Sequence, residues 1–159
     1  MEKIKEKTNA IRTLEQKEID FKFYSFKVDS AVSGVEVAKI LGVPVEKVYK
    51  TLVTVGKSNN HYVFVIPAQK ELDLKKSAKI ANEKSVEMLK SKDLLPLTGY
   101  VHGGCSPVGM KKMFSTFVDS SAENMPTIIV SGGKIGFQVE LSPEDLKKIV
   151  PFEFASVTD

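Results

Sequence analysis

The sequence contains one cysteine, Cys105, and two histidines, His61 and His102, among its 159 residues. A single cysteine excludes a disulfide within the chain and a zinc site built from several thiolates. The two histidines are far apart and show no metal-ligand spacing. We therefore expect no metal site, and nothing in the sequence calls for another cofactor.

Long hydrophobic runs are also absent. The apolar stretches, such as residues 63–66 and 127–130, are far shorter than the ~20 residues of a membrane-spanning helix. Residues 1–7 mix charges of both signs and have no apolar segment behind them, unlike a secretory signal. These observations predict a cytoplasmic protein that does not associate with membranes.

Arginine is nearly missing: Arg12 is the one arginine among 23 basic residues. With 20 acidic residues, the net charge is +3. Lysine suits phosphate groups, whereas reading of base edges usually recruits arginine. If the chain binds a nucleic acid, we expect contact with the backbone. Lys75, Lys76 and Lys79 fit such a footprint, and they equally fit one solvated helix face.

The chain has the length and composition of one globular domain spanning residues 1–159, with 42% hydrophobic and 27% charged residues. Helix starts are predicted at Thr8, Ser33, Asp73 and Ser142, each of which can cap the following turn. Too few helices separate the strands for a fully parallel sheet, so we predict an α+β domain with a mixed sheet. The strand-like segments are residues 21–28, 48–55, 62–67, 85–88, 114–119, 127–130 and 137–140.

A glycine-rich stretch at residues 99–109 contains four glycines and Pro107, a composition unlike that of an ordinary strand or helix. Such a loop can present several backbone N–H groups, as an anion nest or an oxyanion hole does. A tight connection between two strands explains the same composition. Both interpretations remain open on the residues alone.

Lys50 is the second unusual feature. Strand alternation places it on one face with Val48 and Leu52. An amine between two aliphatic side chains lies either at the margin of a strand or in a pocket. In a pocket it could bind a phosphate or a carboxylate, or polarise a carbonyl.

Several common catalytic arrangements are absent. Residues 131–134 (Ser-Gly-Gly-Lys) lack the spacing of a phosphate-binding Walker loop, and no G-x-S-x-G elbow occurs. Neither Ser106 nor Ser131 has an evident base, and a Cys105–His102 pair is disfavoured against a half-buried thiol. The sequence thus favours a site that holds a ligand and lets the ligand supply the reacting groups.

Three motifs occur in register along nearly the whole chain: Lys50-Thr51-Leu52, the G-G-x-S-P-x-G pattern at residues 103–109, and Ser-Gly-Gly-Lys at residues 131–134. With residues 7–10 (Lys-Thr-Asn-Ala), they resemble the YbaK/EbsC family of the prolyl-tRNA synthetase-associated editing-domain superfamily. The resemblance implies a mixed, barrel-like sheet with surrounding helices. It also implies a trans-editing deacylase for mischarged aminoacyl-tRNA, most often cysteinyl-tRNA(Pro), with prolyl-tRNA synthetase as a partner.

The resemblance also implies which residues act. Lys50 would orient the 3′ end of the tRNA, and Gly103 and Gly104 would present N–H groups to the ester carbonyl, while the thiol of the substrate attacks that carbonyl. Positioning of this kind is worth roughly 7–11 kcal/mol. The implied substrate-binding residues are Phe26, Thr51, Cys105, Ser106, Pro107, Ser131, Gly132, Gly133 and Gln138.

The chain departs from the better-known members at three positions. Phe26 stands in place of a tyrosine, Gln138 in place of an aspartate and Ile135 in place of an arginine. These differences bear on amino-acid specificity and on tRNA contact. The alternatives are an editor of alanyl-tRNA(Pro), a non-catalytic module of the same fold that binds tRNA or the synthetase, and a nucleotide-binding protein.

Overall fold

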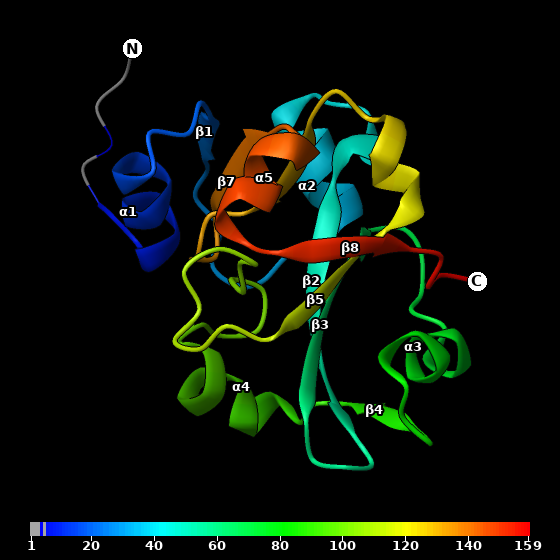
Figure 1. The fold of residues 1–159 in the computed structure, drawn as a ribbon. Helices are drawn as coiled ribbons and strands as arrows, with labels where there is room; N and C mark the ends of the chain where they lie inside the picture. Colours follow the sequence, from blue (N-terminus) through cyan, green and yellow to red (C-terminus); the bar gives the residue numbers. More distant parts are fainter. Residues whose placement is uncertain (1–3, 5) are drawn as a thin grey trace.

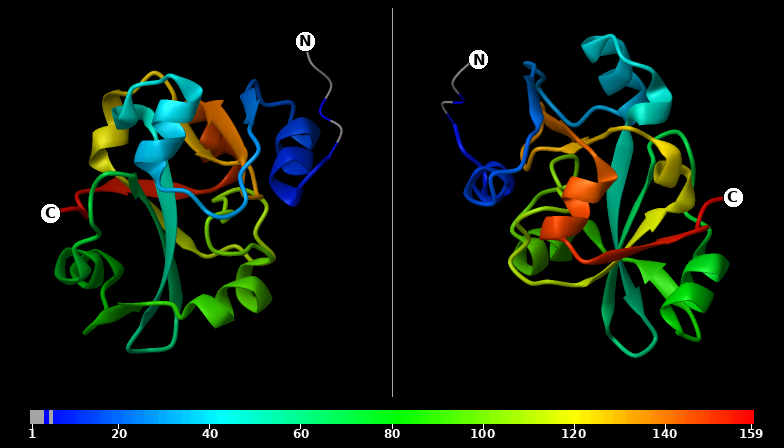
Figure 2. Two further views of the ribbon diagram at one scale, coloured as in Figure 1. Left: turned by 180° about the vertical axis from the view of Figure 1, so that it is seen from behind. Right: turned by 45° about the horizontal axis from the view of Figure 1, so that its top comes forward.

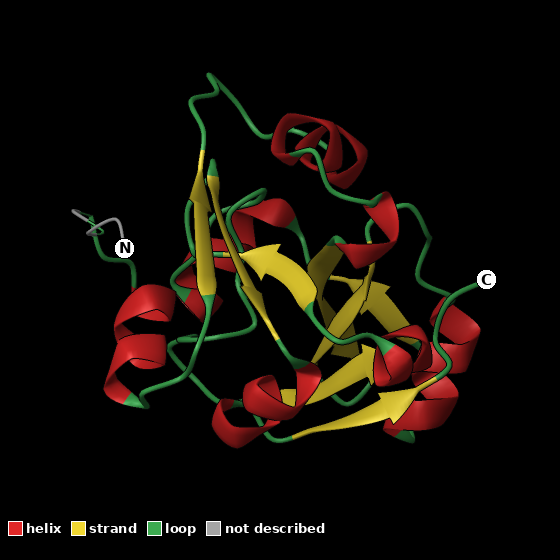
Figure 3. Cartoon of the chain, turned by 90° about the horizontal axis from the view of Figure 1, so that it is seen from above, coloured by secondary structure: helices red, strands yellow, loops and turns green. Residues whose placement is uncertain are grey.

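The computed structural model describes residue 4 and residues 6–159 (Figure 1). This part of the chain forms helices and strands in alternating groups, and Figure 3 shows the helices arranged around the strands. The helices are α1 (Asn9–Gln16), α2 (Gly34–Leu41), α3 (Leu74–Ala81), α4 (Ser91–Thr98) and α5 (Pro143–Ile149), with 3₁₀ helices η1 (Val45–Lys47) and η2 (Ser120–Asn124). The strands are β1 (Lys22–Ser25), β2 (Tyr49–Gly56), β3 (His61–Pro67), β4 (Val86–Met88), β5 (Ser115–Asp119), β6 (Ile128–Ser131), β7 (Phe137–Leu141) and β8 (Phe152–Ala155).

The strands form two sheets. One has the order β1-β7-β6 and is antiparallel, and the other has the order β4-β2-β3-β5-β8, in which β3, β5 and β8 are parallel. A parallel bridge between Val48 and Ile129 links the two sheets. The predicted α+β class with a mixed sheet is confirmed, and the barrel-like arrangement consists of two joined sheets rather than one closed cylinder.

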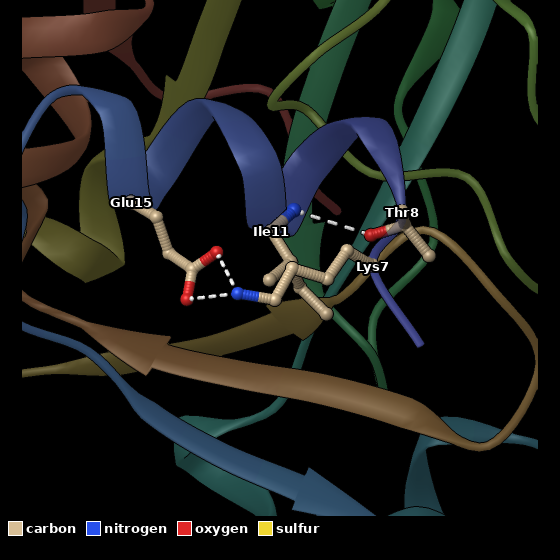
Figure 4. A network of polar contacts seen from close by, with 4 residues as sticks. All are labelled: Lys7, Thr8, Ile11 and Glu15. Atoms are coloured by element: carbon tan, nitrogen blue, oxygen red, sulfur yellow. Dashed lines mark hydrogen bonds and ion pairs between the residues drawn. The ribbon is translucent and has the colours of Figure 1, made fainter. Parts of the chain in front are cut away.

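The helix starts lie where the capping residues predict them. The side chains of Thr8, Ser33, Asp73 and Ser142 each accept a backbone N–H from the first turn of the following helix. Figure 4 shows this bond from Ile11 to Thr8. Such caps satisfy N–H groups that have no partner within the helix and stabilise it by about 1 kcal/mol each.

Three elements differ from the prediction. The spacing of Ile11, Leu14 and Ile19 predicts a first helix that reaches Ile19, but α1 ends at Gln16, because the N–H of Ile19 turns back to the carbonyl of Leu14. The sequence also predicts only a helical turn at residues 93–97, whereas residues 91–98 form a full helix around Pro96. Strand β8 was not predicted, since its sequence is short and follows Pro151; pairing with β5 forms it.

The largest cluster of buried side chains lies between the two sheets and includes Leu14, Val65, Val130 and Leu146. A second cluster packs α3 against β3, and a third packs α2 against Val48. In Figures 1 and 2 the β2–β3 hairpin runs through the molecule, with α2 near one end and β4 near the other. Among the described residues, no helix is long and apolar enough to cross a membrane.

Candidate active site

A cleft of about 340 Å³ lies where the hairpin meets the three-stranded sheet. Four segments form its walls: residues 31–34 with the start of α2, the first half of β2, the turn at residues 102–105, and the facing ends of β6 and β7. Six of the predicted catalytic and substrate-binding residues meet here. They are Lys50, Thr51, Gly103, Cys105, Ser131 and Gln138.

The cleft follows an edge of β2 that β4 does not cover. Strand β4 pairs only with Thr54, Val55 and Gly56, and the carbonyl of Val53 still accepts the N–H of Leu89. Backbone groups of alternate strand residues point to the same edge. The N–H and C=O of Thr51 therefore face this open edge, and the hydroxyl of Thr51 is buried without a hydrogen-bond partner among the described residues.

Lys50 lies on β2 opposite Ile66 and is partly buried. Its side chain lines the cleft, and no ion pair to it occurs within the described part of the chain. Of the two interpretations left open by the sequence, the structure therefore places Lys50 in a pocket. Val48, on the same face, packs against α2, and Leu52 packs against the α3 cluster.

Of the two glycines predicted to act on the ester, only Gly103 lines the cleft. Gly103 has φ +86° and lines the cleft, where an added Cβ would lie 2.5 Å from that of Ala31. Gly104 is buried, and its N–H donates to the carbonyl of Val101 at 3.0 Å. Because this amide is already bonded, Gly104 does not offer a free donor, and the donor role of Gly103 stays a prediction.

Cys105 lines the cleft as a protonated thiol. Burial raises the pKa of this thiol to about 12, although a hydrogen bond with Thr98 opposes the shift. The two residues that follow lie away from the cleft. The fully buried Ser106 accepts the N–H of Val108, and Pro107 lines a separate hollow beside Met110.

In the second glycine motif, residues 131–134, the serine lines the cleft and the two glycines hold the loop beside it. Ser131 lines it and accepts the N–H of Gly133. The carbonyl of Gly132 accepts the hydroxyl of Thr8, and Gly133 has φ +99° with its Cα beside Thr8 and Tyr100. Gly132 and Gly133 thus fix the loop and do not line the cleft.

Phe26 and Gln138 have different surroundings. Phe26 packs against the α2 cluster and does not line the cleft. Gln138, on β7 between Tyr24 of β1 and Ser131 of β6, lines it and is 7% exposed.

Sequence reasoning missed the wall formed by residues 31–34 and considered His102, which also lines the cleft, only as a disfavoured partner of Cys105. Gly34 lies against Ala68, where an added Cβ would come within 2.0 Å. Ser33 was identified as a helix cap, but nothing in Ala31 or Val32 carries recognisable chemistry. Only the fold brings this loop to β2.

Among the described residues, no carboxylate lines the cleft, and Lys50 is the one lysine or arginine that does. Among the described residues no group of three or more His, Cys, Asp or Glu could hold a metal ion. A larger hollow of about 990 Å³ lies between α1, β1 and β7, and it contains none of the predicted site residues. Lys75, Lys76 and Lys79 lie on α3 outside the cleft, so their proposed footprint remains a prediction.

The family model for the aminoacyl-tRNA editing domain matches residues 29–149. The chain belongs to this family. The matched range includes every cleft wall described above.

Individual relatives extend this assignment. A protein of Enterococcus faecalis, provisionally named Cys-tRNA(Pro)/Cys-tRNA(Cys) deacylase EbsC, is 46% identical over 98% of this chain and 96% of its own length. A proline–tRNA ligase of Fervidobacterium nodosum is 32% identical over 61% of this chain, which corresponds to 17% of the ligase. A crystal structure provisionally described as a trans-editing enzyme for prolyl tRNA synthetase superposes with a TM-score of 0.84 at 21% identity, over 95% of each chain, and shows the same fold.

Proposed function

We propose that this chain is a trans-editing deacylase that releases cysteine from mischarged cysteinyl-tRNA(Pro), acting beside prolyl-tRNA synthetase. The observation that carries the proposal is a cleft in which Lys50 and Gly103 come together with no carboxylate from the described part of the chain. The name of the Enterococcus faecalis relative and the family membership support the same activity.

Lys50 is the substrate-anchoring group in this proposal. A lysine ammonium on a rigid strand can bind a phosphate of the tRNA 3′ end as a point charge. Because no acidic residue of residues 6–159 lines the cleft, the Lys50 side chain has no competing carboxylate beside it when an anionic ligand binds. The N–H of Gly103 is the donor for the ester oxygen as negative charge develops on it, an interaction worth about 3 kcal/mol in comparable sites.

Among the described residues that line the cleft, no side chain is an activated nucleophile for the ester. Burial raises the pKa of the Cys105 thiol and holds it protonated, and the hydroxyls of Thr51 and Ser131 make no hydrogen bond to a base. The thiol of the cysteinyl group therefore supplies the attacking atom. Its sulfur bonds to the ester carbonyl carbon, the C–O bond to the tRNA breaks, and the thiol proton passes to the departing ribose oxygen, which leaves the cysteine as a cyclic thioester that water then opens. The enzyme contributes orientation, which suits a site without acid–base machinery.

The test compares cysteinyl-tRNA(Pro) with seryl-tRNA(Pro) and alanyl-tRNA(Pro) in single-turnover deacylation with and without prolyl-tRNA synthetase. We expect rapid loss of the cysteinyl ester and at least 100-fold slower loss of the seryl ester, in which a hydroxyl replaces the thiol. Equal rates for the alanyl ester would contradict thiol-assisted cleavage. Cysteinyl-tRNA(Cys) shows whether the tRNA body adds selectivity.

A further inference from the structure

Gln138 presents an unused hydrogen-bonding group to the cleft. The residue is 7% exposed and lines the cleft, and its carboxamide takes part in no side-chain hydrogen bond within the described part of the chain, so its polar atoms face the open cleft. Buried polar side chains are almost always paired. An unpaired carboxamide at the wall of a cleft therefore points to a ligand group as its partner.

No hydrogen bond joins the Gln138 side chain to its described strand neighbours, whose polar atoms bond other groups. The hydroxyl of Tyr24, its partner on β1, donates to Glu140, and the hydroxyl of Ser131, its partner on β6, accepts from Gly133. Glu140, two residues further along β7, already accepts hydrogen bonds from Tyr24, Lys47 and Thr127. The carboxylate nearest along this strand is thus neutralised and faces a different hollow.

A second polar atom of the cleft is also without a partner. The hydroxyl of Thr51 on β2 is buried and unbonded among the described residues, and Thr51 and Gln138 line the same cleft. The two unsatisfied groups come from different sheets. Together they indicate a small polar ligand group between the sheets.

The charges around this place disfavour a cation. The ionisable groups that line the cleft are Lys50, His102, Tyr49 and Cys105, and burial raises the pKa of both Tyr49 and Cys105, so these two stay neutral. Lys50 adds a positive charge, and no acidic side chain from the described residues lines the cleft opposite it. A ligand ammonium bound here would meet a like charge without a counterion.

We propose that the cleft binds the aminoacyl group with its α-amine uncharged, and that the Gln138 carboxamide is the hydrogen-bonding partner of that amine. The inference rests on the proposed function and adds a specificity-determining residue to it. An α-amino group has a pKa of about 7.7–8.0 in solution, so both of its forms occur at neutral pH. Selecting the free amine couples binding to the release of one proton.

Binding of a non-cleavable ligand tests this directly. The ligand is an adenosine whose 3′-amino group carries cysteine as an amide, and the matched ligand carries 3-mercaptopropanoyl, which lacks the α-amine. Titration calorimetry from pH 6.0 to 8.5, in buffers of different ionisation enthalpy, measures proton release. We expect one proton released below the pKa of the ligand amine, and about tenfold weaker binding for each pH unit below it. The ligand without the amine should bind independently of pH.

Two variants test whether Gln138 is the partner of the ligand amine. Gln138→Met removes the hydrogen bond at similar volume, so we expect about tenfold weaker binding of the amine ligand at pH 8.5 and unchanged binding of the other. Gln138→Glu supplies a counterion, and we expect proton release to vanish and binding at pH 6.0 to strengthen. Circular dichroism melting checks that both variants fold.

Three results would overturn the inference. If the wild type binds the amine ligand without releasing a proton, the inference is wrong and the deacylase proposal stands. The same holds if Gln138→Met binds both ligands as tightly as the wild type. Failure of both ligands to bind the wild-type protein would overturn the inference and the proposed function together.

Discussion

The ammonium of Lys47 and the carboxylate of Glu140 lie 2.5 Å apart and join the two sheets of the protein. Lys47 belongs to η1, which leads into β2, and Glu140 belongs to β7. The pair therefore holds the strand that carries Lys50 against the strand that carries Gln138. Tyr24 and Thr127 donate two further hydrogen bonds to the same carboxylate.

Replacing Glu140 with leucine should destabilise the fold. The change leaves a partly buried ammonium and two hydroxyls without their acceptor, and we expect the free energy of unfolding to fall by about 3 kcal/mol. Urea denaturation measures it. The matched control is Lys148→Ala, which breaks the exposed pair with Asp145 and should change stability by less than about 0.5 kcal/mol. Equal effects of the two variants would contradict the structural role of Glu140.

Stability should also depend on pH through Glu140. Burial alone would raise the pKa of this carboxyl, but hydrogen bonds from Lys47, Thr127 and Tyr24 outweigh it and lower the pKa from 4.5 to about 2. Since the folded pKa is depressed, the contribution is present above pH 4.5 and is lost as the pH falls toward 2. We expect the wild type to lose up to about 3 kcal/mol more than Glu140→Gln between pH 6 and pH 2. Parallel stability curves for the two proteins would show that Glu140 is not the titrating group.

Gly104 is needed for space and Gly42 for backbone conformation, and the two should respond differently to alanine. At Gly104 an added Cβ would lie 3.0–3.1 Å from the backbone of Lys134 and Ile135. Gly42 ends α2 with φ +69° and has nothing within 4 Å of such a Cβ. We expect Gly104→Ala to displace the turn beside the cleft and slow deacylation at least tenfold. Gly42→Ala should cost about 1 kcal/mol of stability and leave the rate unchanged.

The thiol of Cys105 should behave as a wall of the cleft and not as a nucleophile. Because burial raises its pKa to about 12, little thiolate exists at pH 8. We expect iodoacetamide to alkylate native Cys105 at least 100-fold more slowly than the unfolded chain. Cys105→Ala, which changes only the shape of this wall, should slow deacylation by less than about tenfold. Rapid alkylation of the folded protein together with loss of activity in this variant would assign the thiol a chemical role.

Local signals in the sequence were sufficient to predict much of the fold. Caps at Thr8, Ser33 and Asp73 depend on side chains within a few residues of the helix they start, so sequence spacing reveals them. Strand β8 depends on pairing with β5, and the end of α1 depends on how Ile19 turns back onto the helix. Such long-range or irregular contacts leave no periodic pattern in the sequence.

The candidate site was predictable only in part, for a related reason. Motifs identified Lys50 and Gly103, but they cannot show that the N–H of Gly104 is bonded to Val101 or that Pro107 faces another hollow. Residues in one motif can point to opposite sides of a turn. The wall at residues 31–34 carries no motif, because its role comes from packing against Gly103 and Ala68.

The central claim is that Lys50 anchors the substrate of a deacylase, and single-turnover cleavage of cysteinyl-tRNA(Pro) by Lys50→Ala tests it most directly. Lys57→Ala is the matched control, since Lys57 lies exposed at the turn between β2 and β3, away from the cleft. We expect Lys50→Ala to slow cleavage at least 100-fold, which corresponds to about 2.7 kcal/mol, and Lys57→Ala to match the wild type. Cleavage by Lys50→Ala at the wild-type rate would contradict the account.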